Sequence, residues 1–281
     1  MKNKFLKSLL CVLMCIGLIT AVTGCQRKGN EKVHGNEKEH SEMVDESISS
    51  VPKTTTTTEP EKTKREINSD DKLIALTFDD GPYSPVTEKI LDTLEANGAV
   101  ATFFVVGERV DGSESYRKSL KRAYDMGCQI GSHTYSHKLL KSGVSAGTVK
   151  DEIDKSLAAI KNVTGEDAII MRPPGGFCNE NISLPEIMWS VDSRDWKNRD
   201  AAKNYDSVIN SVYDGSIILM HDLYPATADS IERIVPALIA DGYKFVTVSE
   251  LMEARGITME NGHSYSQAKP QVQESTTEAA E

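Results

Sequence analysis

The fold is decided by Leu73-Ile74-Ala75-Leu76-Thr77-Phe78-Asp79-Asp80-Gly81-Pro82, an apolar run that ends in two acids and a turn pair. The apolar part predicts a β-strand, because it is short, rich in strand-favouring side chains and bounded by turn residues. Gly81 and Pro82 stop the strand and permit a backbone bend. That bend would let Asp79 and Asp80, which otherwise point to opposite faces, share one site.

Six further runs of the same kind follow along the chain, and helical patterns separate them. The candidate strands are residues 100–106, 129–132, 168–171, 187–191, 216–220 and 244–248, and the candidate helices include residues 85–97, 145–163 and 226–240. Strands and amphipathic helices in alternation predict an α/β fold in which helices cover a parallel sheet. The crossover from Met171 to Ile187 is too short for a full helix, so we expect an irregular barrel.

Polar residues that can carry chemistry follow the ends of these predicted strands. They are Asp79, Asp80, His133, His137, Arg172, Asp192, Asp195 and His221. The carboxyl ends of all strands in a parallel barrel open on one face, so these scattered residues are expected to converge on one site.

Asp80, His133 and His137 form a candidate metal triad. Two imidazoles and one carboxylate leave a position open for water on an ion such as Zn²⁺, which is typical of catalytic sites. The i, i+4 spacing of the histidines lets both rings reach one ion if the segment turns helically. Taken alone, the HxxxH pair is a weak signal, and an Asp before Gly-Pro is commonly a turn residue.

The overall charge of the chain limits its partners. Of 281 residues, 32 are Lys or Arg and 42 are Asp or Glu, which gives a formal net charge of −10. This acidic balance, without a block of clustered basic residues, argues against a nucleic-acid partner. The sequence does not fix the oligomeric state, and a monomer is the favoured expectation.

Residues 1–24 are predicted to be a signal peptide. Their apolar run, residues 9–22, follows three lysines and is too short for a membrane span of about 20 residues. It ends in Val22-Thr23-Gly24-Cys25, which resembles the lipobox of bacterial lipoproteins. The resemblance implies that Cys25 is the lipidated first residue of the mature chain, anchored to the outer face of the cell membrane. The alternatives are an ordinary cleaved signal and an uncleaved anchor.

Two polar segments are predicted to flank the folded domain. Residues 25–68 contain no Leu, Phe, Tyr or Trp and cannot bury enough apolar surface to fold, so they are expected to form a disordered linker. Residues 69–258 are the predicted folded domain. Residues 259–281 are polar again and are expected to form a disordered tail.

Five motifs, in order along the chain, carry a resemblance to a known family. They are Thr77-Phe78-Asp79-Asp80-Gly81-Pro82, His133-Thr134-Tyr135-Ser136-His137, Arg172-Pro173-Pro174-Gly175-Gly176, Asp192-Ser193-Arg194-Asp195-Trp196 and Leu219-Met220-His221-Asp222. They resemble the motifs of the polysaccharide deacetylases, carbohydrate esterase family 4, also called the NodB-type domain. The resemblance spans about residues 70–252 and implies that residues 69–258 form a catalytic domain with a distorted (β/α)₇ barrel.

The resemblance implies metal-dependent hydrolysis of N-acetyl groups from aminosugar polymers. The implied roles are general base for Asp79, orientation of that base for Arg172, general acid for His221, orientation of that acid for Asp195, and metal binding for Asp80, His133 and His137. The ion expected at two His and one Asp is Zn²⁺, with Co²⁺ or Ni²⁺ as alternatives. The acid must start protonated to serve a leaving amine, and a neighbouring carboxylate favours that charged form.

Three further residues are implied at the substrate groove. Trp196 and Leu219 would line the part that receives the acetyl methyl group, and the backbone N–H of Gly175 would stabilise the oxyanion. The family commonly has an aromatic residue where this chain has Gly175. Phe177 either supplies that ring or packs internally.

The expected substrate is N-acetylglucosamine in peptidoglycan, because a membrane-tethered enzyme has that polymer within reach of its linker. Among enzymes, the alternatives are a chitooligosaccharide or exopolysaccharide deacetylase and an acetylxylan esterase. A glycan-binding lipoprotein without turnover is the alternative from another class. A binding protein has no use for both a general base and a general acid, which favours the enzyme.

Overall fold

The computed structural model describes residues 65–270 of the chain. The predicted signal peptide, the predicted lipidation at Cys25, the linker up to residue 64 and the tail from residue 271 lie outside the described residues. Among the helices that the structure does describe, none combines the length and the apolar character that a membrane span requires.

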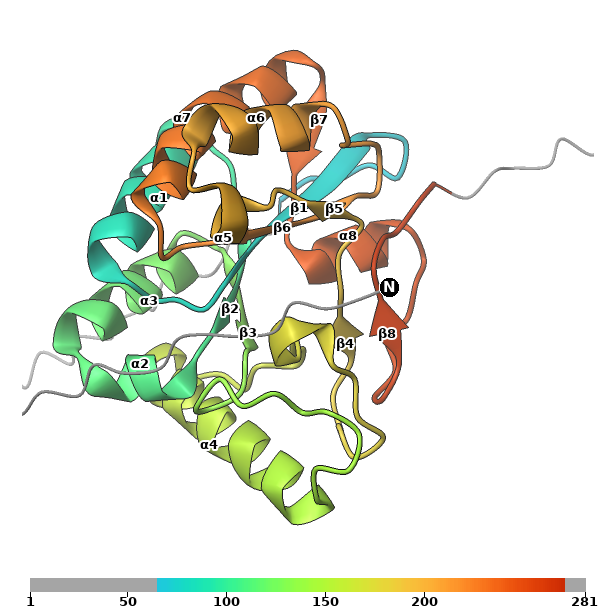
Figure 1. The fold of residues 1–281 in the computed structure, drawn as a ribbon. Helices are drawn as coiled ribbons and strands as arrows, with labels where there is room; N and C mark the ends of the chain where they lie inside the picture. Colours follow the sequence, from blue (N-terminus) through green and yellow to red (C-terminus); the bar gives the residue numbers. More distant parts are fainter. Residues whose placement is uncertain (1–64, 271–281) are drawn as a thin grey trace, which may run out of the picture. The chain divides into compact units, whose positions relative to one another are not determined.

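Six parallel strands form the central sheet (Figure 1). Their order is β3 (Gln129–Ser132), β2 (Thr102–Val105), β1 (Lys72–Asp79), β6 (Ile217–His221) and β5 (Val191–Asp192), and β7 (Tyr243–Phe245) pairs with the start of β1. A second, two-stranded parallel sheet joins β4 (Glu186–Ile187) to β8 (Ser264–Tyr265). The predicted α/β fold with a parallel sheet is therefore confirmed.

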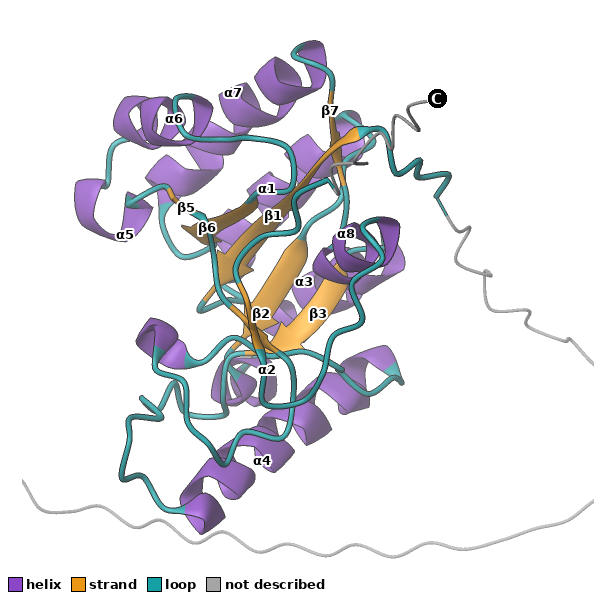
Figure 2. Ribbon diagram, turned by 90° about the vertical axis from the view of Figure 1, so that its right-hand side faces the viewer, coloured by secondary structure: helices purple, strands orange, loops and turns teal. Residues whose placement is uncertain are grey.

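Helices cover this sheet and connect its strands (Figure 2). They are α1 (Ser84–Ala96), α2 (Gly107–Gly112), α3 (Glu114–Asp125), α4 (Ala146–Thr164), α5 (Asp195–Asn198), α6 (Ala201–Ile209), α7 (Pro225–Ala240) and α8 (Val248–Ala254). Local chemistry sets several of their ends. The side chain of Ser145 caps α4, which stops at Gly165 in the left-handed conformation, and Thr247 with Glu250 forms a capping box for α8.

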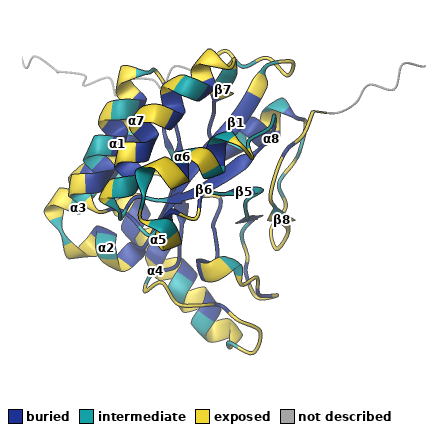
Figure 3. Cartoon of the chain, turned by 45° about the horizontal axis from the view of Figure 1, so that its top comes forward, coloured by how far each residue is buried: buried dark blue, intermediate teal, exposed yellow. Residues whose placement is uncertain are grey.

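Strand β1 lies between two hydrophobic clusters and is buried along almost its whole length (Figure 3). Alternate side chains enter different clusters: Ile74, Leu76 and Phe78 pack with the residues of α1, α3 and α7, whereas Leu73 and Ala75 pack with those of α8. Side chains on a strand alternate between faces, so Thr77 and Asp79 continue the second set. The apolar pattern of β1 thus fixes the direction in which Asp79 points.

The crossover between residues 171 and 187 is irregular, as expected, and contains the short 3₁₀ turn η1 (Pro174–Gly176). The strand predicted at residues 168–171 is wrong. Only Met171 forms bridges, to Ser132 of β3 and Glu186 of β4. The prolines that follow have no N–H group to continue a ladder.

The single strand predicted at residues 187–191 is also wrong, because the chain changes its pairing partner within that segment. The N–H of Met188 donates to the carbonyl of Tyr265 in β8, whereas the N–H of Ser190 donates to the carbonyl of Ile217 in β6. The segment therefore divides into β4 and β5.

The folded part begins earlier than the predicted boundary at residue 69. Arg65 donates to both carboxylate oxygens of Glu250 at 2.7 and 2.8 Å and to the carbonyl of Gly127 at 3.2 Å. Ile67 packs against the cluster beneath α8. Residues 65–68 are thus held by one arginine and one apolar side chain, and the disordered-linker prediction is wrong for them.

The folded part also ends later than the predicted boundary at residue 258. Residues 264–265 form β8, and Ala268 is buried, with its N–H donating to the carbonyl of Gly215 at 2.8 Å. A glycine is needed there, because a Cβ on Gly215 would lie 2.2 Å from the Ala268 carbonyl oxygen. The disordered-tail prediction is wrong for residues 259–270, since backbone pairing orders a segment that its polar composition did not reveal.

Candidate active site

The ends of the central strands bring the predicted base and acid side by side. Asp79 is the last residue of β1, His221 is the last residue of β6, and the two are partners in the parallel register. His133 follows β3, and Asp195 begins α5 shortly after β5. The face predicted from parallel topology is therefore where these side chains gather.

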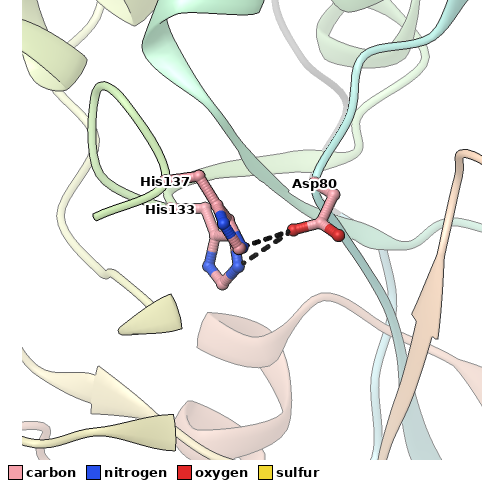
Figure 4. Close-up of side chains that lie close together, drawn as sticks. All are labelled: Asp80, His133 and His137. Carbon is pink, nitrogen blue, oxygen red and sulfur yellow. Dashed lines mark ion pairs between the residues drawn. The ribbon is translucent and has the colours of Figure 1, made fainter. Parts of the chain in front are cut away.

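Asp80, His133 and His137 meet at this face (Figure 4). Asp80 Oδ1 lies 3.3 Å from His133 Nε2 and 3.0 Å from His137 Nε2. Burial favours the neutral carboxyl, but the two imidazoles outweigh it and hold the pKa of Asp80 well below its usual range. Asp80 in turn raises the pKa of His137, against the effect of burial.

The donor set of this triad fits a divalent cation. His133 Nδ1 lies 2.7 Å from the carbonyl oxygen of Arg172, which can only accept, so the neutral ring carries its proton there and presents the Nε2 lone pair. Asp80 Oδ1 is buried and accepts no hydrogen bond from the part of the chain that the structure describes. One candidate ligand atom from each of the three residues lies within 4.8 Å of the others.

The loop that carries both histidines is not helical. The i, i+4 spacing predicts that both rings reach one ion through a helical turn, and that expectation of a helical turn is wrong. Residues 133–137 follow β3 as irregular chain. Thr134 and His137 adopt left-handed conformations with φ of 62° and 58°, and these two turns bring the rings together with centroids 5.1 Å apart. Asp80 is also left-handed, with φ of 73°, which supplies the bend expected before Gly81.

Asp79 is oriented by a fully buried arginine. Arg172 donates through Nη1 to Asp79 Oδ1 at 2.7 Å and to Thr77 Oγ1 at 2.7 Å, and through Nε to the carbonyl of Ile187 at 2.8 Å. Burial lowers the pKa of Arg172, and the Asp79 carboxylate opposes that effect. The other Asp79 oxygen, Oδ2, lies 3.8 Å from His133 Nε2 and faces the triad.

His221 is oriented by Asp195. Asp195 Oδ1 lies 2.8 Å from His221 Nδ1, and Oδ2 accepts from the His221 N–H at 2.8 Å and from Thr227 Oγ1 at 2.7 Å. Burial would lower the pKa of His221, but Asp195, followed by the charges of Asp79 and Asp80, raises it to about 9. Nδ1 is engaged, so Nε2 is the atom left to exchange a proton.

Asp222 belongs to this region, although the sequence interpretation gave it no role. Its buried carboxyl accepts from Thr87 Oγ1 at 2.6 Å and lies over Gly81, where a Cβ would come within 2.1 Å of Oδ1. Burial raises the pKa of Asp222 to about 7. Only glycine fits beside this carboxyl, which explains why the bend after Asp80 uses it.

The implied groove residues lie close in the chain to these groups. Trp196 is half exposed directly after Asp195, and Leu219 is buried in β6 two residues before His221. Gly175, with φ of 66°, has the Phe177 ring 3.0 Å from where its Cβ would be. The Phe177 ring therefore lies beside the position that the first atom of a side chain at residue 175 would occupy. The parts assigned to these residues in substrate binding stay predictions.

Two threonines complete the hydrogen bonding of the site, and sequence reasoning assigned them no part. Thr77 shares the Arg172 guanidinium with Asp79, and Thr227 donates to Asp195. The sequence could have indicated the part of Thr77, because a residue two positions before Asp79 lies on the same face of the predicted strand. Thr227 lies on α7, distant in sequence from the carboxylate it contacts, and carried no comparable signal.

Comparison with known proteins finds a matching family and several relatives. The family model described as polysaccharide deacetylase matches residues 66–186. A peptidoglycan-N-acetylglucosamine deacetylase of Listeria monocytogenes is 42% identical over 196 residues, which is 68% of this chain and 41% of the relative. A peptidoglycan-N-acetylmuramic acid deacetylase of Bacillus subtilis is 37% identical, over 67% of this chain and 40% of the relative. This chain therefore matches less than half the length of either protein.

A solved structure matches over nearly its full length. It is a family 4 acetyl xylan esterase from Clostridium thermocellum in complex with a cobalt ion. It superposes with a TM-score of 0.65 at 32% identity, covering 70% of this chain and 98% of that one.

Proposed function

The chain belongs to the polysaccharide deacetylase family, and on that premise we propose that it hydrolyses N-acetyl groups of an aminosugar polymer, N-acetylglucosamine of peptidoglycan, and releases acetate. One observation carries the proposal. Asp79 and His221 end neighbouring strands beside the triad, and each is fixed by its own buried partner. This is the arrangement that a reaction with one proton acceptor and one proton donor requires.

Asp80, His133 and His137 would hold the divalent ion. Zn²⁺ suits two imidazoles and a carboxylate, and Co²⁺ or Ni²⁺ would also be accepted. When bound, such an ion supplies positive charge that polarises the acetyl carbonyl and acidifies water. Arg172 links this site to the base, since its carbonyl fixes the His133 ring and its guanidinium fixes Asp79.

Asp79 would accept the proton of the attacking water. Arg172 occupies Oδ1, so Oδ2 is the oxygen directed to the water. His221, protonated at neutral pH because its pKa is raised to about 9, would then donate to the leaving nitrogen. The Gly175 N–H would donate to the oxygen that gains negative charge.

Peptidoglycan is proposed as the polymer because two relatives are named for that substrate, one acting on N-acetylglucosamine and the other on N-acetylmuramic acid. The Clostridium thermocellum structure keeps the acetylxylan alternative open. Chitooligosaccharides and exopolysaccharides are further alternatives, because this chain has Gly175, with the Phe177 ring beside it, where the family commonly has an aromatic residue.

Acetate release from three polymers tests the proposal. With Zn²⁺ or Co²⁺ present, we expect the full-length chain to release acetate from peptidoglycan faster than from chitin oligomers or acetylated xylan. Release from xylan alone would replace the deacetylase proposal with an esterase. Binding to glycans without any acetate would favour the glycan-binding lipoprotein.

Metal removal is the matching control in the same assay. Chelation is expected to abolish acetate release, and adding Zn²⁺ or Co²⁺ back is expected to restore it. Activity that survives exhaustive chelation would remove the triad from the reaction.

We also propose that the protein acts outside the cytoplasmic membrane, held at its outer face by a lipidated Cys25. The support is the apolar run followed by Val22-Thr23-Gly24-Cys25. Mass spectrometry of the mature N-terminus is expected to find a diacylated Cys25 as the first residue. An unmodified N-terminus beyond Cys25 would exclude the anchor and leave a secreted protein.

A further inference from the structure

The loop between the two histidines of the triad needs external support. Thr134 and His137 both adopt left-handed backbone conformations, which are unfavourable for residues other than glycine. The loop has no regular ladder of its own. Its shape, which decides where both imidazole rings point, must come from contacts with neighbouring elements.

Helix α2 supports the carbonyl groups of the loop. The N–H of Gly107 donates to the carbonyl of Thr134 at 3.1 Å, and the N–H of Glu108 donates to that of Tyr135 at 2.8 Å. These are N–H groups of the first turn of α2, which have no partner inside their own helix.

One side chain of α4 supports the amide groups of the loop. Glu152 Oε2 accepts from the N–H of Tyr135 at 3.1 Å and from the N–H of Ser136 at 2.8 Å, and Oε1 accepts from Ser136 Oγ at 2.7 Å. A single carboxylate therefore receives three hydrogen bonds from the segment between His133 and His137. Hydrogen bonds to a charged group are stronger than neutral ones.

The placement of Glu152 differs from that of the acids beside it. Asp151 pairs with Lys155, and Asp154 pairs with Lys150, each one turn away on the exposed face of α4. Glu152 is half-buried and faces the loop instead. Ser156, one turn further along α4, bonds through Oγ to Ser132 at 2.9 Å, directly before His133. Helix α4 thus contacts both the loop, through Glu152, and the end of β3 that leads into it, through Ser156.

We infer that Glu152 is a positioning residue for the cation site, which sets the affinity and geometry of the bound ion by fixing the His133–His137 loop. The inference rests on the proposed function, because it needs the triad to bind a metal. Groups that orient metal ligands typically change metal affinity by about 10- to 100-fold when removed.

Metal affinity of the full-length chain tests the inference, with Zn²⁺ titrated against a competing chelator. Glu152→Gln, which keeps the size of the side chain but loses its charge, is expected to weaken Zn²⁺ binding by about tenfold or more. Asp151→Asn on the same helix is the matched control and should bind as the wild type does. Circular dichroism verifies that each variant is folded.

Two further readouts separate positioning from simple loss of negative charge. Ser136→Ala removes one hydrogen bond and leaves the Glu152 charge intact, and it is expected to weaken Zn²⁺ binding by a smaller factor. The visible absorption spectrum of bound Co²⁺, which reports ligand geometry, should change in Glu152→Gln and not in Asp151→Asn.

The outcomes for the two proposals are distinct. If the wild type binds Zn²⁺, and Glu152→Gln binds it equally well with an unchanged Co²⁺ spectrum, the positioning role is overturned. If Glu152→Gln binds more weakly but its Co²⁺ spectrum and the affinity of Ser136→Ala are unchanged, Glu152 acts only through its charge and positioning is again overturned. If the wild type itself binds no divalent ion, the proposed function fails.

Discussion

Asp79→Asn is expected to lower kcat for peptidoglycan deacetylation by about 10²- to 10⁴-fold, which is the usual contribution of a general base. The asparagine side chain has nearly the same shape and can still accept the Arg172 hydrogen bond through its oxygen, but it cannot take a proton from water. Zn²⁺ binding should persist, because Asp80, His133 and His137 are unchanged. Acetate release and Zn²⁺ titration on the same preparation measure both effects.

Folding must be controlled in this variant, since Arg172 is fully buried and loses its counter-charge. Leaving a buried charge unpaired is costly, so a lower Tm is expected. Asp92→Asn, which changes an acid on the exposed side of α1, is the matched control and should keep full activity. A folded, Zn²⁺-binding Asp79→Asn protein with near wild-type kcat would show that Asp79 is not the base.

Much of the central fold could be predicted from the sequence because β1 is decided locally. Its unbroken apolar run, its two acids and the Gly81-Pro82 stop are all contiguous, and the structure places β1 at residues 72–79. The failures lie where pairing is not local. Met171 is held by bridges to two strands, and β8 is ordered by β4, nearly 80 residues earlier in the chain. The amino-acid composition of a segment does not reveal which distant strand will pair with it.

The candidate site likewise contains residues that sequence motifs revealed and residues that only the structure revealed. The residues to which we assign the chemistry, such as Asp79 and His221, stand at strand ends in recognisable motifs. The supporting residues lie on helices: Thr227 donates to Asp195, and Glu152 accepts from the loop between His133 and His137. An acid or a hydroxyl on a helix is usually a solvated surface residue. Each of these two residues forms a hydrogen bond with a residue distant in the sequence, and only the structure reveals that bond. The sequence motifs therefore predicted which side chains gather at the strand ends better than they predicted the residues that hydrogen-bond to them.

His221→Ala is expected to lower kcat for the amide substrate by about 10²- to 10⁴-fold, because an amine leaves poorly without a proton donor. Asp195 keeps its hydrogen bonds from the residue 221 N–H and from Thr227, so the site should remain folded. Hydrolysis of 4-nitrophenyl acetate should fall far less, since its leaving group needs no proton. Asp79→Asn, in contrast, should impair both substrates. Equal losses on the amide and the ester in His221→Ala would contradict the acid role.

The pH profile of the wild type gives an independent check on the same residue. The acid must be protonated, and the pKa of His221 in the substrate-free protein is raised to about 9, so kcat/KM for the amide should hold at neutral pH and fall as pH rises through that region. A cation in the triad offsets the charges of Asp79 and Asp80 and moves this fall to lower pH. Asp195→Asn removes the strongest influence that raises the pKa, and it should move the fall further down. An alkaline limb that stays in place in Asp195→Asn would mean that another group donates the proton.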